Sequence, residues 1–372
     1  MSKLLNLPPL PTIKEIIQLY NLKARQELSQ NFILDLNLTT RIAKVAGDLR
    51  ESTVIEVGAG PGSLTRSLLS LGAKRVIAVE KDARFLPALE VLKEASQGRL
   101  TIVHADMLEV DERQLLRDIA AEPWESEVER VKIVGNLPFN VATEMLLKWL
   151  RQVPERSGSF VCGRTSLTLL FQREVALRLV AAPGSKEYGR LSVMSQQRCD
   201  VQKRFDIVGK AFAPPPDVTA SVVKLKPLVK AKYEVESEPL EYVLRQVFGM
   251  RRKHLRNSVR TLCEPKKPLK EDKRKERDDY DSEDEHLLPP IEHVPSKQEQ
   301  QEEVLRLVEM AGLKENVQPD HLSVVEWCRL ASCFRDWVKQ LPPQSPAALA
   351  YSQFLDNITK KRTRYDSDFF KG

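Results

Sequence analysis

Four consecutive residues, Asn136, Leu137, Pro138 and Phe139, combine groups that suit one kind of chemistry. The Asn136 side-chain oxygen and the Leu137 carbonyl can each accept one hydrogen from an amine. Pro138 stiffens the turn and has no N–H that needs a partner. Phe139 offers a ring face on which an extruded nucleobase can stack. The tetrapeptide indicates chemistry on the exocyclic amine of a nucleobase; a strand-ending turn with a core phenylalanine is the simpler alternative.

A glycine-rich turn lies closer to the N-terminus. Residues 53–57 are apolar and β-branched, which predicts a buried strand, and residues 63–69 look helical. Gly58–Gly62 lie between them, and such a turn lets the backbone approach a nucleotide closely. A second strand, 75–79, ends at Glu80, about 20 residues past the glycines, where a carboxylate can accept hydrogen bonds from ribose hydroxyls.

The glycine turn alone fits NAD, FAD or S-adenosylmethionine, and three details favour the last. The turn has the order Gly-x-Gly-x-Gly and is preceded by Glu56. Asp106 closes a third strand, 100–105, where the amino group of an adenine would lie. A helix cap or turn residue is the simpler interpretation of Asp106 alone. A fourth strand, 131–135, leads into the turn Asn136–Phe139, and the chemistry of a dehydrogenase does not require such a turn. The ordered set therefore predicts methyl transfer, with a NAD-dependent oxidoreductase as the disfavoured alternative.

The composition agrees with this prediction. A chain of 372 residues is long enough for two domains, and its net charge of +6 is compatible with a nucleic-acid substrate. Five scattered cysteines indicate a reducing compartment, and neither they nor the five histidines have metal-ligand spacing. No apolar run is long enough for a membrane span. Residues 1–14 contain lysine but no acid or arginine, which is a weak mitochondrial presequence signal.

Strand and helix alternate from residue 53 to about 228, which predicts an α/β fold with an open, largely parallel sheet. The fold class expected is a Rossmann-like class I S-adenosylmethionine-dependent methyltransferase domain with a smaller all-helical C-terminal domain. Further strands are expected at 166–171, 191–205 and 220–225, and helices at 38–49, 83–96, 141–151 and 172–182.

Changes in composition predict the domain boundaries. The expected parts are an N-terminal extension with a helix (1–28), the methyltransferase domain (29–237), a helical RNA-binding domain (238–263 and 304–358), a disordered charged insertion (264–303) and a flexible tail (359–372). Residues 224–260 contain ten Lys or Arg and four Glu. A basic helix containing Arg251, Arg252, Lys253 and Arg256 would clamp phosphates; a solvated helix face is the alternative.

In this order the motifs resemble those of the ribosomal RNA adenine dimethyltransferases. The resemblance rests on residues 30–33, 56–62, 79–82, 105–106, 135–139, 171–179, 190–193, 212–218 and 248–253. It covers roughly residues 12 to 262 and resumes near 304. The opening segment and residues 160–165 are most similar to the animal mitochondrial members. Ile33 replaces the usual Leu and Phe139 replaces the Tyr of many bacterial members, and both keep the apolar contact.

That resemblance implies transfer of two methyl groups from S-adenosylmethionine to each of two adjacent adenines in the hairpin loop near the 3′ end of small-subunit rRNA. It also implies a monomer that acts on this rRNA or on the assembling small ribosomal subunit in the mitochondrial matrix. Asn136, Leu137, Pro138 and Phe139 would hold the target base, with Phe212 on its other side. The implied cofactor contacts are Gln30, Asn31, Ile33, Gly58, Gly60, Glu80, Lys81, Asp106, Met107 and Asn136.

Two other functions stay open from the sequence alone. A DNA adenine methyltransferase would use the same turn chemistry. A mitochondrial transcription or nucleic-acid-binding factor, in contact with the transcription machinery, would not need catalysis, and the intact catalytic residues argue against it.

Overall fold

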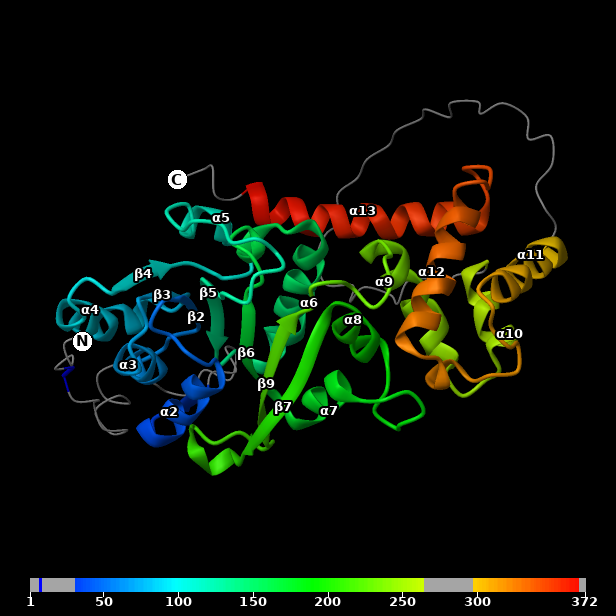
Figure 1. Ribbon diagram of the computed structural model, residues 1–372. Helices are drawn as coiled ribbons and strands as arrows, with labels where there is room; N and C mark the ends of the chain where they lie inside the picture. The colour runs from blue at the N-terminus through cyan, green and yellow to red at the C-terminus, as the bar shows by residue number, and fades with distance from the viewer. Residues whose placement is uncertain (1–6, 9–30, 264–296, 368–372) are drawn as a thin grey trace, which may run out of the picture. The chain divides into compact units, whose positions relative to one another are not determined.

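The computed structural model describes residues 7–8, 31–263 and 297–367. The chain divides into two compact units, Met1–Tyr233 with Lys360–Gly372, and Glu234–Thr359. The first unit contains every strand of the described residues (Figure 1). The helix expected at 12–20 and residues 264–296 of the expected insertion lie outside the described residues.

The first unit is built on a seven-stranded sheet with the order β4-β3-β2-β5-β6-β9-β7. Its strands are β2 (Thr53–Val57), β3 (Arg75–Glu80), β4 (Leu100–His104), β5 (Val131–Gly135), β6 (Ser166–Gln172), β7 (Cys199–Ile207) and β9 (Ala220–Pro227). The first five strands in this order, from β4 through β3, β2 and β5 to β6, are parallel to one another. Strand β9 is antiparallel to both of its neighbours, β6 and β7. The Rossmann-like prediction is confirmed. Because parallel strands end at one edge of a sheet, the loops after β2, β3, β4 and β5 meet there.

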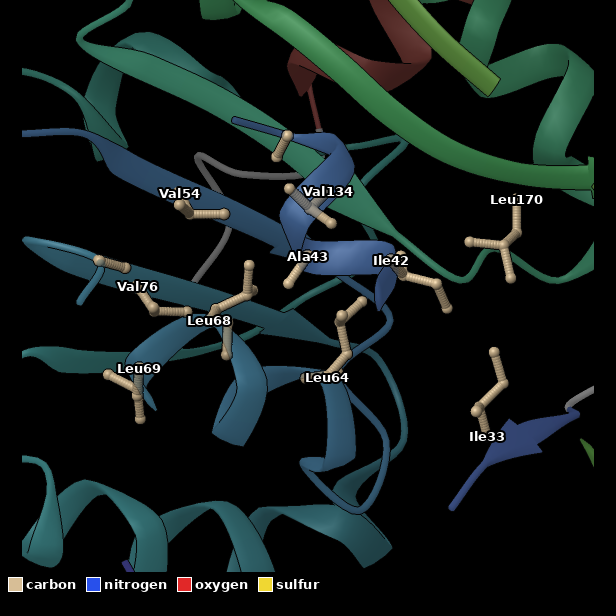
Figure 2. Close-up of a cluster of buried hydrophobic side chains, with 14 of the residues drawn as sticks. Ile33, Ile42, Ala43, Val54, Leu64, Leu68, Leu69, Val76, Val134 and Leu170 are labelled. Carbon is tan, nitrogen blue, oxygen red and sulfur yellow. The ribbon is translucent and has the colours of Figure 1, made fainter. Parts of the chain in front are cut away.

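Helices cover both faces of the sheet. On one face, α2 (Leu36–Val45), α3 (Ser63–Ser70) and α4 (Leu86–Ala95) bury an apolar cluster against the strands. Ile42 and Leu68 from these helices meet Val54 and Val134 in it (Figure 2). The helices α6 (Phe139–Glu155), α7 (Arg173–Val180) and α8 (Arg190–Arg198) contact β6, β7 and β9 and cover the other face. Of their residues, only Phe139 at the start of α6 packs against this cluster.

The region between α7 and β7 differs from the sequence prediction. One strand is expected over 191–205, but Arg190–Arg198 form helix α8, and β7 begins only after it. Gln196 of α8 donates hydrogen bonds to the carbonyls of Leu179 and Ala181, both at 2.9 Å. These carbonyls lie at the end of α7, where they have no partner within the helix. Residues 190–198 are therefore helical because of a contact between two helices, which the local sequence pattern does not indicate.

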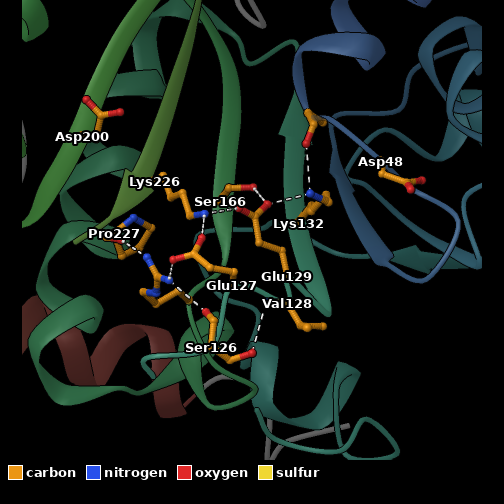
Figure 3. A network of polar contacts seen from close by, with 12 residues as sticks. Asp48, Ser126, Glu127, Val128, Glu129, Lys132, Ser166, Asp200, Lys226 and Pro227 are labelled. Carbon is orange, nitrogen blue, oxygen red and sulfur yellow. Dashed lines mark hydrogen bonds and ion pairs between the residues drawn. The ribbon is translucent and has the colours of Figure 1, made fainter. Parts of the chain in front are cut away.

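A buried polar network joins the starts of β5 and β6 (Figure 3). Glu129 accepts hydrogen bonds from Lys132, at 2.6 Å, and from Ser166, at 2.7 Å, and pairs with Lys226 at 3.2 Å. Burial opposes ionisation of Glu129, but the hydrogen bond and charge of Lys132 outweigh it and lower its pKa to about 2. Lys226 belongs to the basic run 224–260, yet it stabilises the sheet here instead of extending a phosphate clamp.

The second unit is helical. Its helices are α9 (Ser237–Val247), α10 (Leu255–Ser258), α11 (Lys297–Met310), α12 (Val324–Val338) and most of α13 (Pro346–Ser367). Tyr242 of α9 stacks on Phe334 of α12, with ring centroids 5.2 Å apart. It also contacts Tyr351 and Phe354 of α13 edge to face. An aromatic core therefore holds α9, α12 and α13 together.

Two predicted disordered segments are partly helical. Helix α11 begins inside the expected insertion 264–303, and α13 continues into the expected tail 359–372. Among the described side chains of α11, Val304 is the first buried one, and apolar residues occur only in the second half of the helix. Its first turns are polar, and a polar helical segment looks like a loop in the sequence. No helix of the described residues has the length and hydropathy of a membrane span.

Candidate functional site at the carboxyl edge of the sheet

The glycine turn follows β2. Gly58 and Gly60 have φ angles of +71° and +53°, which residues with a Cβ atom rarely adopt. The Gly58 N–H donates to the Val79 carbonyl at 2.9 Å, and the Gly60 N–H donates to Glu80 Oε2 at 2.7 Å. The turn is therefore fixed by the end of the neighbouring strand β3, which also carries the predicted ribose acceptor.

Glu80 is buried, and both of its oxygens have backbone partners. Oε1 accepts from the Asp82 N–H at 2.8 Å, while Oε2 accepts from Gly60. Burial raises the pKa of Glu80, and these hydrogen bonds oppose that shift. Each carboxylate oxygen keeps a second lone pair that a hydroxyl can use. Complete burial raises the pKa of the neighbouring Glu56 to about 8, so Glu56 is protonated at neutral pH.

The residues after β4 form the next part of this edge. Asp106 Oδ1 accepts from the Leu108 N–H at 3.0 Å, and Oδ2 pairs with Lys81 Nζ at 2.7 Å. Lys81 is mostly exposed, and Asp106 is half-buried. Met107 is buried. The structure therefore brings Lys81, Asp106 and Met107 together beside Glu80, and a ligand amine at Asp106 would share the carboxylate with Lys81.

Lys148 of α6 holds this loop in place, a role that the sequence analysis did not predict. Its ammonium donates to the carbonyls of Met107 and Val110, both at 2.9 Å, and pairs with Glu112 at 3.2 Å. Glu112 is buried and also accepts from Trp149 Nε1 at 3.2 Å. Because α6 begins at Phe139, the last residue of the predicted catalytic turn Asn136–Phe139, one helix connects that turn with the loop after β4. In the sequence, the only signal for this role of Lys148 is its position among residues with the apolar spacing of a helix.

Replacement of Lys148 by methionine is expected to lower the free energy of unfolding by about 3–5 kcal/mol, because it leaves the buried Glu112 carboxylate without its cation. Chemical denaturation measures this change. The double variant Lys148→Met/Glu112→Gln should recover part of the loss, since the carboxylate is then gone while two carbonyls stay unpaired. As a control, Lys93→Met removes an exposed pair with Glu90 and should cost less than about 1 kcal/mol. A Lys148→Met loss no larger than the control would contradict a supporting role.

The predicted catalytic turn follows β5 and lies beside the glycine turn. A Cβ atom added to Gly58 would lie 3.5 Å from the backbone oxygen of Asn136. Asn136 Nδ2 donates to the Asn31 carbonyl at 2.7 Å, which turns the side-chain oxygen away from Asn31. Within the described residues, nothing donates to this oxygen or to the Leu137 carbonyl. These two adjacent oxygens are the acceptors that the sequence predicts for the target amine, and that role stays a prediction.

Pro138 and Phe139 begin helix α6. The Pro138 carbonyl accepts from the N–H groups of Val141 and Ala142, both at 3.1 Å, so the turn leads directly into the helix. Phe139 is half-buried and packs against the apolar cluster of the sheet. Its expected stacking on a target base stays a prediction.

A short antiparallel pair, β1 (Phe32–Ile33) with β8 (Phe212–Ala213), was not predicted. It places Ile33 opposite Phe212, and both side chains are buried in the cluster that Phe139 contacts. Figure 2 shows Ile33 pointing toward Leu170. Phe212 is only 4% exposed, so its ring packs in the core, and its expected contact with a target base stays a prediction. Gln30 lies outside the described residues.

The predicted RNA-binding residues all belong to the second unit. Arg251, Arg252 and Lys253 lie in an exposed turn before α10, and Arg256 is exposed on α10 itself. The Lys253 N–H donates to the Met250 carbonyl at 2.9 Å, which closes the turn. The expected basic helix is therefore a basic turn. In the described part of the chain, no three His, Cys, Asp or Glu side chains are grouped as metal ligands would be.

Comparison with known proteins decides the family. The sequence model of a family described as "Ribosomal RNA adenine dimethylase" matches residues 21–280. This chain belongs to that family. The match includes the glycine turn, the acidic ends of β3 and β4 and the catalytic turn, so it covers every part of the edge described above.

Full-length relatives agree with the family assignment. A protein from Vermamoeba vermiformis named "Dimethyladenosine transferase 1, mitochondrial" is 41% identical, over 92% of this chain and 99% of the relative. The human protein of the same name is 38% identical, over 96% and 93%. The "Ribosomal RNA small subunit methyltransferase A" of Bradyrhizobium diazoefficiens is 45% identical, over 70% and 86%. A crystal structure of a dimethyladenosine transferase from Plasmodium falciparum, 19% identical, covers 82% of this chain and 98% of its own with a TM-score of 0.58 and shares the fold.

The cofactor of this family fits the residues at the edge of the sheet. The glycine turn presents backbone without Cβ atoms, Glu80 ends β3, and Asp106 follows β4. A nucleoside needs hydroxyl acceptors and an acceptor for its adenine amine, and carboxylates at these two positions suit both needs. The methyl donor is S-adenosylmethionine, as the sequence predicts.

Proposed function

We propose that this enzyme transfers methyl groups from S-adenosylmethionine to two adjacent adenines in the 3′-terminal hairpin loop of small-subunit rRNA, two groups to each amine. The orientation of Asn136 carries the proposal, because its oxygen and the Leu137 carbonyl are two acceptors beside the glycine turn. Relatives named as mitochondrial dimethyladenosine transferase and as small-subunit rRNA methyltransferase support the substrate, and the former support a mitochondrial location.

The two acceptors would activate the amine. The lone pair of an adenine amine is delocalised into the ring, so the planar nitrogen is a poor nucleophile. Hydrogen bonds to Asn136 Oδ1 and the Leu137 carbonyl draw its hydrogens out of the ring plane and favour a tetrahedral nitrogen. Bound S-adenosylmethionine supplies an electrophilic methyl group and leaves as a neutral thioether, and the methylated nitrogen then loses one proton to water. Holding the amine in register can contribute roughly 7–11 kcal/mol to lowering the barrier.

We assign the cofactor to residues from four segments of the same edge. Gly58 and Gly60 would lie against it through their backbone, Glu80 would accept from the ribose, and Asp106 from the adenine amine. Lys81 and Met107 would contact the cofactor beside Glu80 and Asp106. Asn31, Ile33 and Asn136 would contact it from the segments around β1 and after β5. Phe139 would stack on the target base, which returns about 1–3 kcal/mol of the few kcal/mol that extrusion costs.

Methyl transfer to RNA and to DNA can be compared directly. The full-length protein is incubated with radiolabelled S-adenosylmethionine and either the rRNA hairpin or duplex DNA. We expect up to four methyl groups per hairpin and none on DNA. Primer extension should then stop at the two adenines, because dimethyladenine cannot pair. Preferential labelling of DNA would overturn the substrate assignment.

The basic turn is proposed to bind RNA phosphates. Neutralising Arg251, Arg252 and Lys253 together should weaken hairpin binding by about tenfold or more at physiological salt, because counterion release accompanies each phosphate contact. The slope of log affinity against log salt should fall by about one for each phosphate that the variant no longer neutralises. Binding titrations at several salt concentrations measure both quantities. Replacing the exposed Lys314 and Lys339 of the same unit is the control, and an unchanged slope in the triple variant would exclude the turn.

A function in transcription has no support from the described residues or from the relatives. The features of the site serve methyl transfer, and none of them is specific to a transcription partner. Dimethylation of rRNA is accordingly the single function proposed, with the rRNA or the assembling small subunit as its partner.

A further inference from the structure

Phe32 lies directly against the glycine turn. A Cβ atom added to Gly60 would lie 2.9 Å from both Cδ1 and Cε1 of Phe32, so the ring packs on the bare Cα of that glycine. The ring also meets Phe85 edge to face, with centroids 4.9 Å apart. Phe85 is fully buried after β3. The Phe32 ring therefore contacts both the glycine turn and the protein core.

The residues on either side of Phe32 reach the catalytic turn and its surroundings. The Asn31 carbonyl accepts the hydrogen bond from Asn136 Nδ2 that orients the catalytic amide. Ile33 pairs with Phe212 in the β1–β8 ladder. Three consecutive residues thus contact the glycine turn, the amide of Asn136 and the β8 strand.

We infer that Phe32 is a positioning residue that couples the glycine turn to the orientation of the Asn136 amide. The inference deepens the proposed function and rests on it. Consecutive Cα atoms are 3.8 Å apart along a planar peptide, so a shift of Phe32 is transmitted to the Asn31 carbonyl. A hydrogen bond of 2.7 Å weakens when its atoms move by a few tenths of an ångström. Movement of the turn therefore reaches the amine acceptor through Phe32 and Asn31.

This coupling has a direct chemical consequence. When the turn is in its binding conformation, Phe32 fixes Asn31, and Asn31 keeps Asn136 Oδ1 turned toward the amine. Without the ring, Gly60 gains space and the Asn136 amide can rotate, which would present its NH2 group to the adenine amine. Two NH2 groups repel each other. The site would then bind the cofactor less well and hold the base in an unproductive way.

The test compares Phe32→Ala, Phe32→Leu and Phe32→Tyr in the full-length protein. Calorimetry with S-adenosylhomocysteine measures affinity at the turn, and single-turnover methyl transfer to the rRNA hairpin at saturating cofactor measures amide positioning. We expect Phe32→Ala to raise the dissociation constant about tenfold and to lower the single-turnover rate about tenfold. Phe32→Tyr should restore both values to within about twofold, and Phe32→Leu should lie between. Leu36→Ala, an exposed apolar residue at the start of α2, is the matched control and should change neither quantity.

A double-mutant cycle tests the coupling itself. If Phe32 acts through Asn136, the effects of Phe32→Ala and Asn136→Ala on the single-turnover rate are not additive, and the double variant is hardly slower than Asn136→Ala alone. Additive effects would overturn the inference, as would a folded Phe32→Ala protein with wild-type affinity and rate. If Phe32→Ala does not fold, the same cycle is run with Phe32→Leu.

The outcome is distinguishable from failure of the proposed function. If the wild-type protein transfers no methyl groups to the hairpin, the proposed substrate is wrong. The affinity for S-adenosylhomocysteine can still be measured in that case, and the cycle is then run on that affinity. Non-additivity would support the connection between Phe32 and Asn136, and additivity would overturn it.

Discussion

Asn136→Ala is expected to lower the rate constant of methyl transfer by about 10²–10³-fold, because it removes one of two preorganised acceptors that face the reacting amine. The Leu137 carbonyl alone cannot hold both hydrogens. The affinity for S-adenosylmethionine should fall by less than about tenfold, since the glycine turn, Glu80 and Asp106 remain. Single-turnover transfer to the rRNA hairpin and calorimetric titration separate these two effects.

Two further variants show which atom of Asn136 matters. Asn136→Asp keeps an oxygen toward the amine but places a second oxygen against the Asn31 carbonyl, where Nδ2 now donates at 2.7 Å. This variant should therefore also lose most of its activity. Asn140→Ala, four residues along and exposed on α6, is the matched control and should transfer methyl groups at the wild-type rate. An active Asn136→Asp protein would show that orientation by Asn31 is unimportant.

Local patterns were sufficient for the elements that carry the site. Strands β2, β3 and β5 are short, mostly apolar runs that lead to residues with distinctive chemistry, namely Gly58, Glu80 and Asn136. Their bounds could be predicted closely because a buried parallel strand needs apolar residues on both faces. Parallel order then brings these ends to one edge. The main components of the site follow from the sequence for this reason.

The supporting contacts could not be predicted, because each depends on residues far apart in the chain. The β1–β8 ladder joins Phe32 and Ile33 to Phe212 and Ala213, and a two-residue strand has no periodicity. The contact of Lys148 with the loop after β4 likewise appears only when α6 packs beside that loop. Sequence motifs thus predict which groups react, whereas the contacts that hold those groups in position appear only in the structure.

Glu80→Ala is expected to raise the dissociation constant of S-adenosylmethionine by about 100-fold, or about 2.7 kcal/mol. The substitution removes the ribose acceptor and also leaves the N–H groups of Gly60 and Asp82 without their partner. Glu80→Gln keeps one acceptor oxygen and should lose less affinity. Calorimetry measures each variant against Glu90→Gln, an exposed carboxylate on α4 that should bind the cofactor as the wild type does. Unchanged affinity in Glu80→Ala would place the ribose elsewhere.

The raised pKa of Glu80 adds a pH dependence with a definite sign. Burial favours the neutral acid, so the pKa of Glu80 lies above its usual value. Ribose hydroxyls donate to the carboxylate, and affinity for the cofactor should therefore fall as the pH decreases through this raised pKa. The contribution to folding has the opposite sign: it is fully present below the unfolded pKa and is lost as the pH rises through the folded pKa. Binding and unfolding titrations of wild type and Glu80→Gln should consequently show opposite slopes that both disappear in the variant, and a slope that survives in Glu80→Gln would belong to another group.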